Sequence, residues 1–353
     1  SHRNLLAWVT AAQAEKRGDG LWFYLGTFWF SLAAGAAVLV LAPLRVGKMV
    51  GLVWLLGPVL AFWISRPTKK ARPLPQNDRA FLLHQATLIW RYFSHFLRRQ
   101  DHYLPPDNYQ EQPGPILARR TSPTNIGLGM LSVMAAADLE LISRRRGAEL
   151  LGHMLDTVEK LEKWRGHLYN WYDTRTLAPL HPRYVSTVDS GNLRGCLIAL
   201  GEGLRTWGEE DLARRAGALE KAMDCSPLYD RERRLFSIGY EVERDRLTDG
   251  YYDLMASEAR QTSFIAVARG EVPFRHWRQL GRMLLGDNDY SGMASWTGTM
   301  FEYFMPHLLL PCEPNSFLYE TLSFCVYAQK RRGSRTKTPG ASPSRAFTPL
   351  TLA

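Results

Sequence analysis

The sequence predicts an all-α protein, in which a transmembrane helical hairpin precedes a larger helical body. Two long apolar runs without charge lie near the N-terminus, over residues 21–44 and 49–65. In the rest of the chain, apolar residues recur at intervals of three and four, and no run alternates convincingly with a period of two. A chain of 353 residues with 46% hydrophobic residues can bury a sizeable core, which excludes general disorder.

The two apolar runs predict membrane spans. The first has 24 residues, which exceeds the roughly 20 that cross a bilayer, and the second has 17, at the lower limit. Aromatic residues crowd one end of the first run at 22–24, and Trp63 closes the second, as at membrane interfaces. A cleaved secretory signal is disfavoured because the first run is too long and a second follows at once. A buried helical pair of a soluble protein remains the alternative.

The basic residues beside these spans predict the orientation of the hairpin. Both ends of a hairpin lie on one face of the membrane, and that face would carry seven Lys and Arg against two in the turn. The positive-inside rule therefore places the body in the cytoplasm. The seven are Arg3, Lys16, Arg17, Arg66, Lys69, Lys70 and Arg72, and the two are Arg45 and Lys48.

The formal charge of +10 is concentrated at the two ends of the chain. Residues 1–72 carry +7 and residues 330–353 carry +6, so the body between them carries −3. A nucleic-acid partner is therefore not expected.

No metal or cofactor is expected. The cysteines lack CxxC or metal-ligand spacing and are predicted to pack in the core of a protein from a reducing compartment. The histidines considered also show no ligand spacing, and no glycine motif would cradle a phosphate. The residues are Cys196, Cys225, Cys312 and Cys325, and His153, His167, His181 and His276.

Helical spacing recurs through the body after the Pro-rich linker. Asp78 and Thr124 are plausible N-caps of the first two helices, which are expected to run to about residues 99 and 142. The spacing continues over 151–161 and 193–204, and further helices are expected near 209–223, 254–269, 274–286 and 315–330.

The connectors between these helices are of two kinds. Some are short and polar, such as "SRRRG", whereas others are long and rich in aromatic, acidic and glycine residues, such as "YLPPDNYQEQPG" and "FSIGYEVERDRLTDGYYD". If the helices pair antiparallel, long connectors at every second joint gather at one end, as in an (α/α)6 barrel. Loops longer than about 12 residues in a compact domain usually carry function.

The long connector "GHLYNWYDTRTLAPLHPRYVSTVDSGNLRG", residues 166–195, has the composition of a carbohydrate cleft. Aromatic faces stack on the apolar faces of sugar rings, and Asp, Asn and Arg side chains bind the hydroxyl groups. Composition alone also fits a packed loop between helices, so both interpretations stay open at this point.

Several motifs resemble the glycoamylase-like domain of cyclic β-1,2-glucan synthases. The resemblance runs from about Phe81 to Tyr327 and includes "TSPTNIGLGMLSVMAAADL", "YYDLMASEARQTSFIAVARGEVP", "HWRQLGR" and "SWTGTMFEYFMP". It implies an (α/α)6 domain that cyclises linear β-1,2-glucan by transglycosylation, within a multi-pass protein of the bacterial inner membrane. β-1,2-Glucan, the lipid bilayer and other domains of a parent synthase are the implied partners. The chain would be an internal fragment.

The resemblance also implies a catalytic carboxyl group. Transfer with retention needs two carboxylates roughly 5–5.5 Å apart, one acting as acid/base and one as nucleophile. Glu258, in "ASEAR", matches the general acid/base, although a solvated glutamate at a helix end would be the simpler interpretation without the motif.

The second carboxylate is expected in a "PWGISES" segment, which the chain lacks. After Lys330 the sequence turns into "KRRGSRTKTPGASPSRAFTPLTLA", which has no acidic residue and is expected to be disordered. Codons exist for Thr338–Thr351 whose second reading frame encodes "PWGISESGFYAFD", with the lost Glu across Pro343 and Ser344. We therefore expect a frameshifted tail and an incomplete (α/α)6 barrel, and sequencing the gene tests this.

Substrate-binding residues are expected around Glu258. Asp173 and Asp189 would hold sugar hydroxyls, although Asp189 would equally suit a helix cap, and Glu302 would bind sugar or pair with an arginine. Arg260 is assigned to the substrate rather than to tuning Glu258. The remaining candidates are Tyr109, Trp171, Tyr172, Asn192, Trp296 and Tyr303. For the aromatic ones, packing against other side chains is the alternative.

Five segments and three functions follow from the sequence. The segments are a juxtamembrane stretch (1–20), two spans (21–66), a linker (67–80), the glycoamylase-like domain (81–329) and the aberrant tail (330–353). Transglycosylation of β-1,2-glucan is the first function. The alternatives are an endo-β-1,2-glucanase, or a glucan-binding membrane module that is inactive without its second carboxylate.

Overall fold

The computed structural model describes residues 20–65 and 73–336. The chain divides into two compact units, Ser1–Asp78 and Arg79–Ala353. The predictions for residues 1–19 of the juxtamembrane stretch, residues 67–72 of the linker, the seven basic residues and residues 337–353 of the tail lie outside the described residues.

The first unit contains one helix that is long and apolar enough to cross a membrane, α4 (Arg45–Ile64). The helices α2 (Leu21–Thr27) and α3 (Trp29–Leu41) meet at a bend of 68° and make a second span only if the bent pair counts as one. One or two apolar helices are weak evidence for a membrane protein, so the predicted transmembrane hairpin is unconfirmed.

Glycines allow α3 and α4 to pack closely. A Cβ atom on Gly35 would lie 2.8 Å from the carbonyl oxygen of Gly51, and one on Gly51 would lie 2.9 Å from that of Gly35. The Ser31 hydroxyl donates to the carbonyl oxygen of Trp54 at 2.7 Å. Small residues at a helix contact and a hydroxyl bonded to the facing backbone are typical of helix pairs in membranes.

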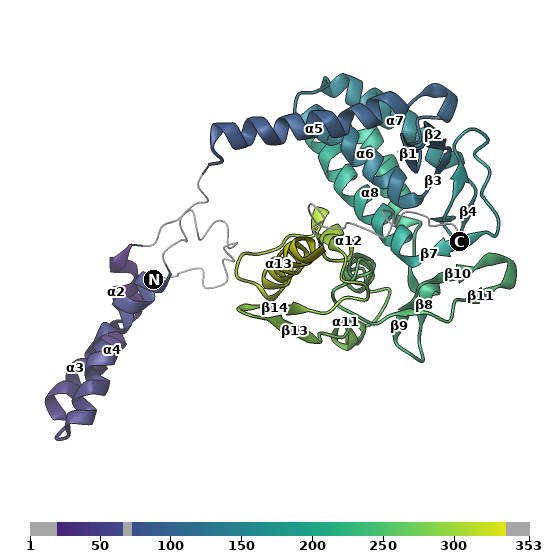
Figure 1. The fold of residues 1–353 in the computed structure, drawn as a ribbon. Helices are drawn as coiled ribbons and strands as arrows, with labels where there is room; N and C mark the ends of the chain where they lie inside the picture. Colours follow the sequence, from purple (N-terminus) through teal and green to yellow (C-terminus); the bar gives the residue numbers. More distant parts are fainter. Residues whose placement is uncertain (1–19, 66–72, 337–353) are drawn as a thin grey trace. The chain divides into compact units, whose positions relative to one another are not determined.

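Nine α-helices follow within residues 73–336 (Figure 1). They are α5 (Gln76–Phe96), α6 (Pro123–Asp138), α7 (Arg144–Lys160), α8 (Thr187–Trp207), α9 (Glu210–Lys221), α10 (Arg260–Ala268), α11 (Arg275–Gln279), α12 (Met300–Phe304) and α13 (Phe317–Thr336).

These helices form an inner and an outer row. In the inner row, α6 packs against α8 and α8 against α10, whereas α7 packs against α9. Of the 21 residues of α8, 13 are buried, while α7 and α9 bury one face. Gly191 permits the contact between α8 and α10, because a Cβ atom there would lie 1.8 Å from Oγ1 of Thr262.

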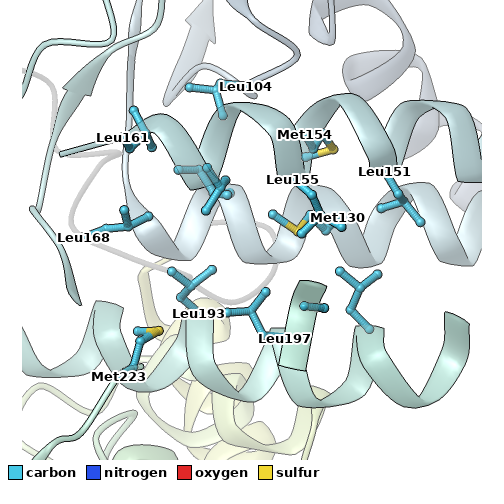
Figure 2. Packing of buried hydrophobic residues seen from close by; sticks show 14 of the residues in the cluster. Leu104, Met130, Leu151, Met154, Leu155, Leu161, Leu168, Leu193, Leu197 and Met223 are labelled. Atoms are coloured by element: carbon cyan, nitrogen blue, oxygen red, sulfur yellow. The ribbon is translucent and has the colours of Figure 1, made fainter. Parts of the chain in front are cut away.

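One large apolar cluster fills the space between the rows (Figure 2). Met130 of α6, Leu151 and Leu155 of α7, and Leu193 and Leu197 of α8 are all almost wholly buried in it. A smaller cluster around Met255, Met293 and Tyr303 supports the last helices. The inner helices are thereby fixed at their flanks, which leaves their N-terminal ends to carry the polar connectors.

The body is mostly helical, as predicted, but its connectors also contain short antiparallel strands that were not expected. Strands of two to four residues are too short to show an alternating pattern. They are β1 (Asn108–Gln110), β2 (Ile116–Ala118), β3 (Arg120–Thr121), β4 (Lys163–Trp164), β5 (His167–Leu168), β6 (Tyr172–Asp173), β7 (Tyr184–Ser186), β8 (Tyr229–Asp230), β9 (Leu235–Ser237), β10 (Gly239–Glu241), β11 (Arg246–Leu247), β12 (Tyr251–Tyr252), β13 (Leu284–Asp287) and β14 (Tyr290–Met293). Their orders are β1-β2, β3-β6, β4-β5, β11-β10-β7, β12-β9-β8 and β13-β14.

Several predicted helix ends also need correction. Ser122, not Thr124, caps α6, and Asp78 lies in the first turn of α5 rather than before it. The helix predicted from 254 begins only at Arg260, and the one predicted to reach 286 gives way to β13. The tail was predicted to be non-helical from Lys330, but α13 continues to Thr336.

Candidate active site

Polar residues gather where inner helices begin. Thr124 lies in the first turn of α6, Asp189 in that of α8 and Glu302 in that of α12, while Glu258 precedes α10 by two residues. The charges of Asp189 and Glu302 both act on Glu258. The structure therefore brings these three predicted residues together, as expected if the long connectors share one end of the helices.

Glu258 has the environment of a proton donor. It follows two buried residues, Ala256 and Ser257, in a segment that the amide of Met255 fixes by donating to the carbonyl oxygen of Gly281 at 2.9 Å. Burial, and then the charges of Asp189 and Glu302, raise the pKa of Glu258 from 4.5 to about 7. A carboxyl group with such a pKa can donate and accept a proton near neutral pH.

Asp189 links the first turns of two inner helices. Its Oδ1 accepts from the hydroxyl and the amide of Thr124, at 2.6 and 3.3 Å. With the Asn170 amide oriented to satisfy both neighbours, Asn170 donates to Oδ2 of Asp189 and accepts from Nε1 of Trp171, each at 3.0 Å. The alternative role of Asp189 as a helix cap is wrong, because Ser186 caps α8.

Glu302 is held by the loop that precedes α12. Its Oε2 accepts from Ser295 Oγ at 2.9 Å and from the hydroxyl and amide of Thr297 at 2.7 and 3.0 Å. Within that loop Trp296 is 55% exposed, and its Nε1 donates to Asp253 at 3.1 Å. Trp296 thus presents an open aromatic face from an anchored ring, whereas the pairing of Glu302 with an arginine is not seen among the described ion pairs.

Tyr252 is a residue of the site that the sequence analysis missed. Burial, and then the charges of Glu258, Tyr184, Asp189 and Glu302, raise its pKa. Its ring centroid lies 6.4 Å from that of Trp296. The two adjacent tyrosines in the connector segment "TDGYYD" indicated a possible site residue. The sequence does not show which of the two rings lies close to the carboxyl groups.

A second group of polar residues is connected to the half-buried Trp171 through Arg120. The Arg120 guanidinium lies 4.5 Å from the centre of the indole ring and donates to Oδ2 of Asp107 at 3.0 and 3.1 Å. Asn125, in the first turn of α6, donates to the other oxygen of Asp107 at 3.5 Å. Asp107, Arg120 and Asn125 were also missed, because Trp171, which Arg120 contacts, comes from a different connector.

Direct sugar contact is contradicted for four predicted residues. Tyr172 is wholly buried and donates to the carbonyl oxygen of Glu162, and Tyr303 is buried and donates to that of Met293. Asn192 and Arg260 are 1% and 3% exposed. Asn192 donates to Thr124 Oγ1 at 3.2 Å, and Arg260 contacts His307 Nε2 at 2.8 Å. All four are therefore buried residues whose polar groups contact other parts of the protein.

Two further candidates lie on the surface of connectors. Oδ1 of Asp173 accepts from the amides of Arg175 and Thr176, each at 2.8 Å, and so orders its own loop. Tyr109 is 42% exposed in β1, with its ring 5.6 Å from that of Phe96. Within the part of the chain that the structure describes, no three His, Cys, Asp or Glu side chains converge as metal ligands would.

Comparison with known proteins shows what the chain as a whole is similar to. No family model matches the chain. The chain is 30% identical, over 98% of its length, to the cyclic β-(1,2)-glucan synthase NdvB of Rhizobium meliloti strain 1021.

The resemblance to cyclic β-1,2-glucan synthases is confirmed.

The chain spans only 17% of the length of that synthase. The alignment has 483 positions against the 353 residues of this chain, so the synthase carries insertions within the matched region.

Solved structures share the fold. The endo-β-1,2-glucanase of Chitinophaga pinensis superposes with a TM-score of 0.59 and 16% identity, over 76% of this chain and 69% of that one. A glucoamylase-like protein of Bacteroides uniformis gives 0.61 and 12% identity, over 76% and 68%. The endo-β-1,2-glucanase of Talaromyces funiculosus gives 0.55 and 10% identity, over 73% and 66%. The body therefore has the α/α barrel fold of glucoamylase-like proteins.

Proposed function

We propose that the helical body transfers glycosyl groups of linear β-1,2-glucan to form cyclic β-1,2-glucan, with Glu258 as the general acid/base. The observation that carries the proposal is the half-buried carboxyl group of Glu258, with a pKa near 7, at the end where the inner helices begin. The protonated group would donate to the leaving glycosidic oxygen, and the carboxylate would then accept a proton from the incoming hydroxyl.

Asp189 and Glu302 favour the protonated state of Glu258 in this proposal. Two negative charges beside a half-buried carboxyl group oppose its ionisation. Neither is proposed as the nucleophile. Both oxygens of Asp189 and Oε2 of Glu302 accept hydrogen bonds within the site, which holds them in place and lowers their reactivity. We propose that the nucleophile belongs to the segment that the chain lacks.

The exposed face of Trp296 and the group around Trp171 are the proposed sugar-binding surfaces. Trp296 is anchored through its indole nitrogen and keeps most of its ring open, so it can stack on a pyranose ring. Arg120 lies over Trp171 and is bonded to Asp107, which also accepts from Asn125, so this group offers side chains that bind hydroxyls. Solved neighbours include a glucanase in complex with sophorotriose and glucose, and another with β-1,2-glucan, which supports this class of substrate.

Two other functions compete with transglycosylation. Hydrolysis of β-1,2-glucan is one alternative, because two of the solved structures with the same fold are endo-β-1,2-glucanases. A glucan-binding membrane module is the other alternative, because both oxygens of Asp189 and Oε2 of Glu302 already accept hydrogen bonds. The products distinguish the three, because transglycosylation yields rings, hydrolysis yields oligomers with reducing ends, and a binding module yields neither.

We also propose that the first unit anchors the body in a bacterial inner membrane, with the body in the cytoplasm and beside other domains of a parent synthase. Its apolar side chains are exposed along α3 and α4, including Trp29 and Trp63. Such surface is typical of helices that face lipid.

Incubation with linear β-1,2-glucan tests the proposed function. The chain as it stands should bind the glucan without turnover, and a version with the "PWGISES" segment restored should release rings. Reducing-end oligomers from the restored version would instead establish hydrolysis. If the restored version binds glucan but yields no product, the assignment of Glu258 fails.

Asp189→Asn should lower the pKa of Glu258, because it removes one of the two charges that oppose ionisation. The asparagine side chain is neutral but retains an oxygen that can accept the hydrogen bond from Thr124. Titration of ¹³C-labelled glutamate carboxyl groups by NMR measures the shift. Asp211→Asn, on the exposed surface of α9, is the matched control and should leave the pKa unchanged. An unchanged pKa in Asp189→Asn would show that the two groups are not coupled.

A further inference from the structure

Asp189 is held by donors on both of its carboxylate oxygens. Thr124 supplies the hydroxyl and the amide that bond Oδ1, and the Thr124 hydroxyl in turn accepts from Asn192 at 3.2 Å. Oδ2 accepts from the side-chain amide of Asn170 at 3.0 Å, the one donor found for that oxygen among the described residues. The orientation of the Asp189 carboxylate therefore depends on Asn170 as well as on Thr124.

The side chain of Asn170 has a partner on each side. Its amide nitrogen donates to Asp189, and its oxygen accepts from Nε1 of Trp171 at 3.0 Å. A side-chain amide offers a donor and an acceptor side by side, whereas an aspartate of the same shape would offer no donor. Asn170 therefore joins the carboxylate of Asp189 to the indole ring that the Arg120 guanidinium covers.

The backbone of Asn170 is attached to the segment from which α8 begins. The Asn170 amide donates to the carbonyl oxygen of Tyr184 in β7 at 2.7 Å. Two residues later, Ser186 caps α8 by accepting from the amide of Asp189 at 3.2 Å. The strand β7 thus fixes both partners, Asn170 through its backbone and Asp189 through the helix cap, so their side chains meet at a fixed separation.

The first turn of α8 is also attached to the segment that carries Glu258. Thr262 Oγ1 donates to the carbonyl oxygen of Thr187 at 3.0 Å, and Gln261 Nε2 donates to a carbonyl oxygen one turn further along at 3.1 Å. Both donors lie in the first turn of α10, and each side chain is 1% exposed. The backbones that carry Asp189 and Glu258 are therefore fixed relative to each other, and the side-chain contacts of Asp189 decide where its charge lies.

We propose that Asn170 is a positioning residue for the acid/base Glu258, on which it acts by holding the carboxylate of Asp189 and by joining it to Trp171. The inference rests on the proposed role of Glu258. The amide N–H of Asn170 directs the charge of Asp189 and offsets part of it. A sugar ring bound at Trp171 would contact the same chain of hydrogen bonds that sets the charge around Glu258.

Asn170→Leu should raise the pKa of Glu258, because Asp189 then opposes its ionisation with a charge that no amide dipole offsets. We expect a rise of roughly 0.5 to 1 pH unit from the value of about 7. Asn170→Asp keeps the shape and an acceptor for Trp171 but adds a charge, so it should raise the pKa further. Titration of ¹³C-labelled glutamate carboxyl groups in the detergent-solubilised full chain measures both. Asn77→Leu, at an exposed position in the first turn of α5, is the matched control and should leave the pKa unchanged.

A double variant separates this role from a general effect on the structure. Since Asn170 acts through Asp189, Asn170→Leu should change the pKa of Glu258 by less than about 0.2 pH unit in a chain that already carries Asp189→Asn. The other titratable groups that face Glu258 or Asp189 have no hydrogen bond to the side chain of Asn170 and are unchanged in every variant; they are Glu302, Tyr252 and Tyr184.

The pH–rate profile gives a second readout in the version with the "PWGISES" segment restored. Its alkaline limb should move to higher pH by the same amount as the pKa in Asn170→Leu, since the protonated form of Glu258 donates to the leaving oxygen. An unchanged pKa in Asn170→Leu and Asn170→Asp, an equal rise in the double variant, or a limb that stays in place overturns the inference while the assignment of Glu258 stands. If Glu258 of the parent chain titrates near 4.5, that assignment fails and the inference fails with it.

Discussion

Glu258→Gln should lower the turnover of linear β-1,2-glucan by about 10²- to 10⁴-fold in a protein that carries both carboxylates, because a general acid/base contributes about that factor. The amide has nearly the size of the carboxyl group, so the affinity for glucan should change little. Product release measured by chromatography gives the rate, and calorimetry gives the affinity. Equal loss of binding and turnover would mean that Glu258 holds the substrate rather than transfers a proton.

The same variant should stabilise the chain in neutral solution. The pKa of Glu258 is about 7 in the folded protein, against 4.5 ordinarily. Below pH 4.5 the group is protonated in both states and costs nothing. As the pH rises from 4.5 to 7, the folded protein binds more protons than the unfolded one, so the free energy of unfolding falls, by about 3 kcal/mol in total. Glu258→Gln removes this loss.

Denaturant unfolding at pH 4 and pH 8 measures the effect. The variant and the parent should be equally stable at pH 4, and the variant should be more stable by about 3 kcal/mol at pH 8. Glu149→Gln, at an exposed ion pair on α7, is the control and should change the free energy of unfolding by less than about 0.5 kcal/mol at either pH. A variant no more stable than the parent at pH 8 would show that Glu258 ionises normally.

Arg194→Met should destabilise the helical body by about 3 kcal/mol, because it removes the buried cation that Glu220 and Glu271 share and leaves Glu220 only its ion pair with the half-exposed Arg269. Arg194 of α8 donates to Glu220 of α9 at 3.0 Å and to Glu271, just beyond α10, at 2.8 Å. The side chains of Arg194 and Glu220 are each 4% exposed. Arg194, Glu220 and Glu271 therefore connect α8 with α9 and with the end of α10, close to the first turn of α8 that contains Asp189.

The whole buried group provides the control for this prediction. Replacing Arg194, Glu220 and Glu271 together by Met should recover most of the lost free energy of unfolding, since a buried ion pair contributes little beyond an apolar replacement. Guanidinium unfolding followed by tryptophan fluorescence measures both variants. If Arg194→Met lowers the free energy of unfolding by less than about 1 kcal/mol, then water or a rearrangement of side chains replaces Arg194 as the partner of the two acids.

The helices were predictable from the sequence because their apolar faces are long and regular. The spacing around Leu151, Leu155, Leu193 and Leu197 predicted helices whose side chains now form the core. The short strands were not predictable, because β6 or β12 has only two residues and is formed by pairing with a distant segment. The start of α10 was predicted too early. The sequence from Leu254 has helical spacing, but Leu254 forms a β-bridge with Gly281 that holds its backbone in an extended conformation.

The carboxyl groups of the site were predictable, whereas the contacts around them were not. Glu258, Asp189 and Glu302 belong to recognisable motifs, and their charges act on one another in the structure. Composition also suggested Tyr172 and Tyr303, but both rings turn into the core, where a backbone carbonyl oxygen accepts a hydrogen bond from each hydroxyl. Tyr252 and Arg120 were missed because their neighbours come from distant connectors.

A structure of the chain with a linear β-1,2-glucan oligosaccharide tests the central claim most directly. We predict that a glycosidic oxygen of the oligosaccharide, or a hydroxyl group that passes the proton of Glu258 to that oxygen, lies within about 3.2 Å of the Glu258 carboxyl group. We also predict a sugar ring on Trp296. An oligosaccharide bound elsewhere on the body, with Glu258 and Trp296 both free of it, would contradict the account.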